Sequence, residues 1–231
     1  VADAVNFGRL SLTATNANII ESSGTQFSGL NISGNLTMQS ENSMIDEEGA
    51  SLTVGGLATL TVTGQPQQIL FDGVANSFAA LNLASDNITI NLADNTTLTG
   101  VVSDNLVINA PVGIIAVANG SNFIVDQRAD LRARRIILNE DANVEVGSLS
   151  LSTRGGGAIE IRTDINPRLA AGNPTNASGS IQIIAPDIFL GVDGKTVSLN
   201  TVGGPEGGSI SINGVDASGL PDPASGTVHV A

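Results

Sequence analysis

The chain contains no cysteine, no tryptophan and no tyrosine, and phenylalanine is its only aromatic residue besides one histidine. Without cysteine, the protein can form neither disulfide bonds nor thiolate metal sites, although this alone does not assign it to a cellular compartment. Without tryptophan and tyrosine, it lacks the side chains on which bound sugars usually stack. The apolar residues are instead leucine, isoleucine, valine and alanine, which suit a narrow core of stacked aliphatic side chains.

Basic residues are also scarce, with 9 lysines and arginines against 22 acidic residues and a net charge of −13. Between Leu10 and Gln127 there is neither lysine nor arginine. Nucleic-acid binding draws its affinity largely from these two residues, so we expect no nucleic-acid partner. The longest uncharged apolar stretch, residues 105–125, is interrupted by Asn, Pro and Gly, and therefore predicts no membrane span. No N-terminal signal is visible, so we expect a mature form or a piece of something longer.

Short alternating segments recur along the chain. In the segment Phe78-Ala-Ala-Leu81-Asn-Leu83, a period of two puts Leu81 and Leu83 on one face of a strand and Asn82 on the other. Similar segments begin at Phe7 and Phe27. One such unit has nothing against which to bury its apolar face, whereas stacked units share a continuous core.

Two styles of repeat divide the chain. Residues 1–147 contain two approximate copies of a unit of about 70 residues. Residues 148–231 continue with Gly-x-aliphatic-x-aliphatic repeats, in which the glycine marks a corner with positive φ or close backbone approach, and with Pro/Gly-containing insertions at residues 166–176 and 203–208. The four repeats begin at Gly157, Gly179, Gly208 and Gly226.

These patterns predict an all-β fold, a right-handed parallel β-helix (β-solenoid) of about ten coils with about 20 residues each. Each strand is expected to have ordinary short length. No window shows helical periodicity with caps. An antiparallel sandwich is the alternative architecture, because it also contains many short strands.

Several passages resemble the repeats of filamentous-haemagglutinin-type exoproteins of bacteria, namely residues 34–38, 50–62 and 69–78, and residues 207–212 with 216–219 resemble the more C-terminal repeats of related large exoproteins. The resemblance covers most of the chain and places it in the shaft repeat region. It implies a right-handed parallel β-helix, two-partner secretion through an outer-membrane transporter, an extracellular or cell-surface location, and a role in cell adhesion or surface display. It implies no catalytic residue and no cofactor. The receptor or glycan on a host or neighbouring cell stays unidentified.

The densest basic feature is a run of four arginines with one aspartate between them, which is a candidate patch for an anionic sugar or phosphate. Asp130, and Glu140 and Asp141 further along, offer ion-pair partners, so surface arginines that are solvated or paired are the competing interpretation. The four arginines are Arg128, Arg132, Arg134 and Arg135.

Asp46, Glu47 and Glu48 form a carboxylate run at a predicted turn. Such a run could hold Ca²⁺ or act in a β-helix enzyme that processes acidic polysaccharides, with Asp46 or Glu48 as the essential group. The glycine-rich nonapeptide of calcium-bound solenoids is missing, however. His229, the single histidine, lies between Val228 and Val230 and is predicted to face outward without a catalytic role.

The sequence thus favours a non-enzymatic, extracellular rod that displays loops such as residues 166–176. The alternatives are a polysaccharide-processing β-helix enzyme and a fibre element that assembles by end-to-end stacking of solenoid segments. End-to-end stacking follows from the unpaired strand edges that the first and last coils of an open stack present.

Overall fold

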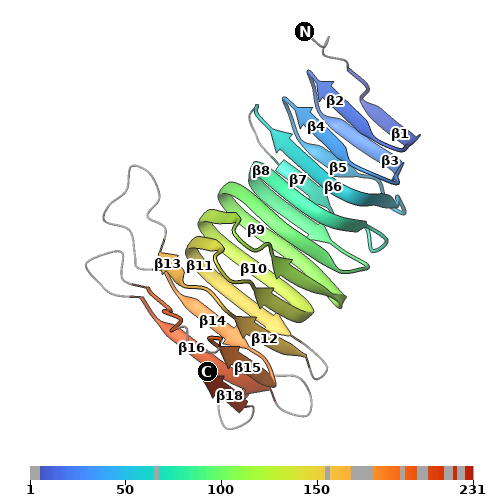
Figure 1. Ribbon diagram of the computed structural model, residues 1–231. Coiled ribbons are helices and arrows are strands. Elements are labelled where there is room, and N and C mark those ends of the chain that lie inside the picture. Colours follow the sequence, from blue (N-terminus) through green and yellow to red (C-terminus); the bar gives the residue numbers. More distant parts are fainter. Residues whose placement is uncertain are drawn as a thin grey trace.

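The structure is a computed structural model that describes residues 6–64, 68–153, 157–167, 179–192, 196–201, 208–215, 221–222 and 227–230. Within these residues the regular elements are all β-strands, which stack into one elongated body from the N-terminal to the C-terminal end (Figure 1). The strands are β1 (Arg9–Ala14), β2 (Ala17–Glu21), β3 (Thr25–Ile32), β4 (Leu36–Ser40), β5 (Met44–Asp46), β6 (Leu52–Val62), β7 (Gln68–Phe71), β8 (Ser77–Asn91), β9 (Thr96–Val117), β10 (Asn122–Leu138), β11 (Asn143–Thr153), β12 (Ala158–Ile161), β13 (Ile165–Pro167), β14 (Ile181–Ile184), β15 (Asp187–Leu190), β16 (Ile210–Val215), β17 (Pro221–Asp222) and β18 (Thr227–Val230).

Strands of successive coils pair in parallel, which makes the fold a parallel β-solenoid as predicted and excludes the antiparallel sandwich. Among the described strands, only β16 and β17 pair antiparallel. One continuous ladder follows the length of the stack through Arg9, Gln26, Ile45, Leu70, Thr89, Val107, Asp130, Ser150, Gln182 and Ser211.

The length of a coil follows from the residue numbers along this ladder. Up to Ser150 the steps, by subtraction, are 17 to 25 residues, close to the predicted period. The next two steps are 32 and 29 residues, and they contain the predicted insertions. Residues 168–176 and 203–207 of those insertions lie outside the described part of the chain. The boundary between residues 147 and 148 falls within β11, which pairs with β10 on both sides of it. Both repeat styles therefore belong to one stack.

Each coil contributes strands to three columns, which we name after one strand in each. The β14 face contains the ladder above. The β15 face contains the ladder Ile115, Ile136, Ile159, Ile188 and Val228. The β13 face contains the ladder Met38, Leu60, Leu83, Gly100, Phe123, Val144 and Ile165.

The expectation that every strand is short is wrong. β8, β9 and β10 have 15, 22 and 17 residues, because strand pairing continues around the corners between faces. At the corners the register shifts, for example between Val125 and Arg128 and between Ala133 and Arg135. The shift lets the backbone turn while the hydrogen-bonded ladder to the adjacent coil is kept.

The core is one hydrophobic cluster that extends along the stack. In β9, Leu106 and Ile108 are buried, whereas the intervening Val107 is only partly covered. Three of the four buried phenylalanines pack together, with ring centroids 5.6 Å apart for Phe27 and Phe71 and 6.0 Å apart for Phe71 and Phe78. The alternation read from the sequence therefore identifies the buried side correctly.

The glycines that open the C-terminal repeats allow close backbone approach between coils, as predicted. A Cβ atom at Gly157 would lie 1.8 Å from the carbonyl oxygen of Arg134, and one at Gly179 would lie 1.4 Å from that of Gly147. No side chain fits at such distances, so the coil can turn there only with glycine. The fourth such glycine, Gly226, lies outside the described residues.

Outward asparagines form ladders of side-chain hydrogen bonds between adjacent coils. The Nδ2 of Asn105 donates to the Oδ1 of Asn87 at 3.1 Å, and the Nδ2 of Asn109 donates to the Oδ1 of Asn91 at 3.3 Å. These contacts run parallel to the backbone ladder and add coil-to-coil hydrogen bonds outside the core.

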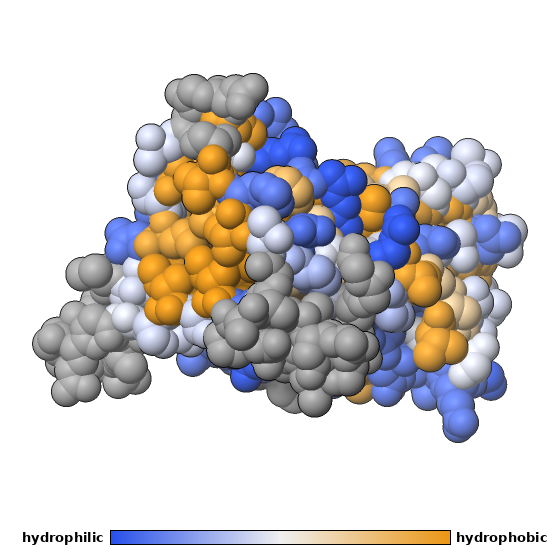
Figure 2. Space-filling model, turned by 90° about the horizontal axis from the view of Figure 1, so that it is seen from below, coloured by the Kyte–Doolittle hydropathy of each residue, from blue (hydrophilic) through white to orange (hydrophobic). Residues whose placement is uncertain are grey.

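The C-terminal end of the stack presents apolar side chains to solvent. Val228, Val230 and Ile210 are 49%, 77% and 44% exposed, although Val228 and Ile210 occupy the same ladder positions as the buried Ile188 and Ile181. Figure 2 views the molecule from this end and shows hydrophobic residues gathered there. No helix among the described residues is long and apolar enough to cross a membrane.

Candidate functional site

The four arginines of the predicted patch are divided between two faces by the corner at Ala133/Arg135. Arg128 and Arg132 lie on the β14 face, where their strand pairs with Ser148 and Ser152. Arg135 lies on the β15 face, in register with Ile114. The four arginines therefore do not lie on one face of the stack.

On the β14 face, Arg128 and Arg132 share the carboxylate of Asp130. Arg132 donates from Nε to Oδ1 at 3.1 Å and from Nη2 to Oδ2 at 2.6 Å, and Arg128 is 3.3 Å from Oδ2. The two arginine side chains cover Asp130, which is buried. The hydrogen bond to Asp130, followed by its charge, raises the pKa of Arg132. The predicted pairing with Asp130 is confirmed, and because one carboxylate is shared by two guanidinium groups, one positive charge is left over on this face.

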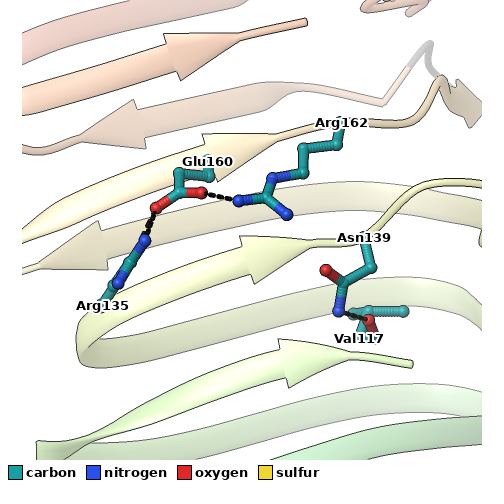
Figure 3. Close-up of polar contacts among 5 residues, drawn as sticks. All are labelled: Val117, Arg135, Asn139, Glu160 and Arg162. Carbon is teal, nitrogen blue, oxygen red and sulfur yellow. Dashed lines mark hydrogen bonds and ion pairs between the residues drawn. The ribbon is translucent and has the colours of Figure 1, made fainter. Parts of the chain in front are cut away.

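On the β15 face, Glu160 is held between two arginines from different coils (Figure 3). Arg135 reaches it from the preceding coil, with Nε 2.7 Å from Oε1, and Arg162 of the same coil donates to Oε2. Burial of Glu160 would raise its pKa, but the hydrogen bonds from Arg135 and Arg162, and then their charges, lower the pKa below the ordinary value. Asn139 bridges coils nearby by donating to the carbonyl oxygen of Val117 at 2.8 Å.

Arg134 differs from the other three arginines. Its side chain is exposed, and it forms no ion pair within the described ranges. It borders a hollow of about 450 Å³ on the β15 face, together with Arg135 and Glu160 and with Asp187 and Phe189 of a later coil. Of the four predicted arginines, Arg134 is thus the one without an ion pair in the described ranges.

Phe189 and Asp187 are functional candidates that the sequence reasoning missed. They come from β15, which pairs directly with β12, so that Phe189 lies beside Glu160 and Asp187 beside Ala158. The signal was present in the repeats, because Glu160, Phe189 and His229 are the middle residues of three aliphatic-x-aliphatic segments. Aligning those segments would have placed the three side chains in one outward row.

His229 lies on the outer side of β18, as the alternation predicted. Its ring stacks on that of Phe189, with centroids 4.5 Å apart and planes 8° from parallel. Its Nε2 is 4.0 Å from the Oδ1 of Asp187. The two rings therefore lie face to face across two coils, and His229 covers one face of Phe189, an aromatic contact that a chain without tryptophan and tyrosine was not expected to have.

The carboxylates of residues 46–48 do not converge. Asp46 accepts hydrogen bonds from the backbone N–H groups of Asp72 and Gly73, at 3.0 and 2.9 Å, and from the Nδ2 of Asn76 at 2.9 Å. Glu47 pairs with Arg9, whereas Glu48 is exposed. Both oxygens of Asp46 therefore hold the turn of the next coil, and no cluster of three metal-binding side chains occurs in the part of the chain that the structure describes.

Glu21 is a buried carboxylate at the N-terminal end of the stack. Its Oε1 accepts from the backbone N–H of Phe7 at 3.0 Å and from the Ser23 hydroxyl at 2.7 Å, and its Oε2 accepts from the Thr25 hydroxyl at 2.7 Å. Buried carboxylates require such partners, and here they tie the first strand to the second coil. The arrangement is structural.

Comparisons with protein-family models, with curated proteins and with solved structures found no match for this chain.

Proposed function

We propose that the chain is a structural, non-enzymatic segment of a large exported bacterial exoprotein, a stiff rod that displays surface loops for attachment to cells or matrix. We further propose that the solenoid is right-handed and has about ten coils, because crossovers between parallel strands are almost always right-handed. The continuous ladder from Arg9 to Ser211 supports a rod of this kind.

The observation that carries the proposal is the use of outward polar side chains. Asparagine ladders, the Asp46 turn contacts and the Arg135–Glu160 pair all join one coil to the next. Such contacts stiffen the stack along its axis, because each coil is fixed to its neighbours both inside and outside. A rod that resists bending is what a spacer or attachment shaft requires.

Location and partners belong to the same proposal. The resemblance to filamentous-haemagglutinin-type repeats supports an extracellular or cell-surface location, export by an outer-membrane transporter, and a receptor or glycan on another cell as the binding partner. The acidic stretch between Leu10 and Gln127 supports the absence of a nucleic-acid partner, since a phosphate backbone would be repelled there.

Surface attachment provides the test. Beads coated with the folded chain are incubated with bacterial and with mammalian cells, and bound beads are counted by microscopy. We expect attachment by the folded chain and none by beads coated with the same chain after heat unfolding. Equal counts for the folded chain and for beads coated with an unrelated acidic protein would contradict the proposal.

The competing enzymatic interpretation makes a separate prediction. If Asp46 or Glu48 processed acidic polysaccharides, the folded chain would shorten polygalacturonate, and the substitution Asp46→Asn or Glu48→Gln would abolish this. We expect no change in polymer length with the parent chain, because both oxygens of Asp46 accept hydrogen bonds from the next turn. Size-exclusion chromatography of the polymer after incubation measures the outcome.

A second candidate function, end-to-end assembly, is favoured by the apolar C-terminal end of the stack. Exposed side chains at inward-facing positions form an apolar surface on which another coil can pack. Light scattering against concentration should show association that Val228→Asp reduces, with Val112→Asp as the control because Val112 is exposed away from this end. A concentration-independent monomer would remove this candidate.

A further inference from the structure

The hollow on the β15 face combines three kinds of group that face one ligand-sized space. Arg134 offers a guanidinium without an ion-pair partner in the described ranges, Asp187 offers a half-exposed carboxylate, and Phe189 offers an aromatic ring that is 39% exposed. The volume of about 450 Å³ lies within the range of small-molecule sites, about 300–1,000 Å³.

The charges of the hollow select against a simple inorganic anion. Arg135 and Arg162 both pair with Glu160, whereas Arg134 has no ion pair in the described ranges and borders the hollow together with the carboxylate of Asp187. A phosphate would be attracted by Arg134 but repelled by Asp187. A ligand with one carboxylate and several hydroxyl groups satisfies both, because its carboxylate pairs with Arg134 and its hydroxyls donate to Asp187.

The ring of Phe189 suits the apolar part of such a ligand. His229 covers Phe189 from the coil on one side, so the ring is held flat and its exposed part borders the hollow. A sugar ring presents an apolar face of C–H groups that packs on an aromatic ring, while its hydroxyls project sideways. The hollow crosses four successive coils, from Ile114 to Phe189, and at about 4.8 Å per coil this amounts to roughly 14 Å.

We infer that this hollow binds a segment of a uronate-containing oligosaccharide, with Arg134 on the sugar carboxylate, Asp187 on its hydroxyls and Phe189 against its ring. The inference deepens the proposed attachment function, on which its biological meaning rests, by naming the class of ligand. The binding itself is a property of the chain and is measured without cells.

Calorimetric titration of the folded chain with oligogalacturonate tests the site. We expect saturable binding that weakens about tenfold or more in Arg134→Gln, since one charge-assisted bidentate contact is lost. Phe189→Ala should weaken it by a similar factor. The matched control is Arg128→Gln, which replaces an exposed arginine on the β14 face. The affinity of this variant for oligogalacturonate should differ from that of the parent by less than about threefold. Circular dichroism confirms that each variant is folded.

Three results would overturn the inference. The first is the absence of saturable binding by the parent chain. The second is equal weakening by Arg134→Gln and Arg128→Gln, which would mean unspecific attraction to positive charge. The third is equal competition by inorganic phosphate and by free galacturonate, which would mean an anion site without recognition of the sugar. Cell attachment that persists with Arg134→Gln beads would overturn only the link between this site and attachment, while leaving the proposed attachment function intact.

Discussion

Thr96 and Ser85 bring hydroxyl groups into the interior, where neither forms a hydrogen bond within the described residues. A buried hydroxyl without a partner loses its hydration and gains nothing in return. The two buried hydroxyls therefore lower the free energy of unfolding, and a substitution that removes one of them should raise it.

We expect Thr96→Val to raise the free energy of unfolding by about 1 kcal/mol, because valine has the shape of threonine without the unpaired hydroxyl. Urea titration followed by circular dichroism measures the change. The neighbouring Thr97 is only partly buried, so Thr97→Val should stay within about 0.5 kcal/mol of the parent. A loss of stability in Thr96→Val would show that its hydroxyl has a partner after all.

Glu160 gives the molecule an acid-sensitive contact. Its pKa is lowered in the folded protein and returns to the ordinary value on unfolding, so the contribution of Glu160 to stability is present above the unfolded pKa and is lost as the pH falls through the folded pKa. We expect the parent chain to lose more unfolding free energy between about pH 6 and about pH 3 than Glu160→Gln does.

Glu160→Gln should also cost about 1–2 kcal/mol at neutral pH, because the hydrogen bonds from Arg135 and Arg162 lose their charge assistance. The control is Glu48→Gln, at an exposed position of the carboxylate run, which should leave the pH dependence of unfolding unchanged. Identical pH profiles for the parent chain and Glu160→Gln would contradict the assignment. Thermal unfolding at several pH values provides the comparison.

At the scale of the elements, alternation within a strand could be read from the sequence, whereas contacts between coils could not. The burial of Leu106 and Ile108 depends only on a backbone period of two, and it was predicted. The neighbours of Arg134 depend on the length of each coil, which varies from 17 to 32 residues, and on the corner at Ala133/Arg135 that separates it from Arg132. A run of arginines in sequence is therefore divided in space by a corner between two faces.

The inward position of a strand residue has a measurable energetic consequence. We expect Ile108→Asn to cost several kcal/mol of unfolding free energy, because the amide would be buried without partners in the column of aliphatic side chains. Val107→Asn is the matched control, since Val107 points outward between Asn105 and Asn109 and should tolerate a polar group. Equal losses in the two variants, measured by urea titration, would contradict the assigned inward face.

The turn after β7 depends on the carboxylate of the preceding coil. Asp46→Ala leaves two backbone N–H groups without their acceptor and removes one of the two acceptors of the Nδ2 of Asn76, and we expect a loss of about 2–3 kcal/mol. Glu48→Ala, in the same acidic run, should be within about 0.5 kcal/mol of the parent. A larger loss of unfolding free energy in Glu48→Ala than in Asp46→Ala would contradict this structural role of Asp46.

At the scale of the whole molecule, the stack is quasi-one-dimensional, because the backbone ladder joins each coil only to the coils next to it, and side-chain contacts such as Arg9–Glu47 and Phe27–Phe71 reach just one coil further. Its stability is then the sum of coil-to-coil terms, and a coil at an end lacks one of them. The C-terminal end also exposes Val228 and Val230 at positions that would be buried in the interior of the stack. Local opening should therefore start at this end and cost more toward the centre.

Native-state hydrogen exchange measures this gradient. We expect the slowest amide exchange in β8, β9 and β10, whose strands have coils on both sides, and the fastest in β16 and β18. The control is Val228→Asp, which should accelerate exchange in β18 and leave β9 unchanged, because β10, β12 and β15 lie between these two strands on the β15 face. If all strands exchanged at one rate and responded together to Val228→Asp, the stack would unfold as a single cooperative unit, and coil-to-coil additivity would not describe it.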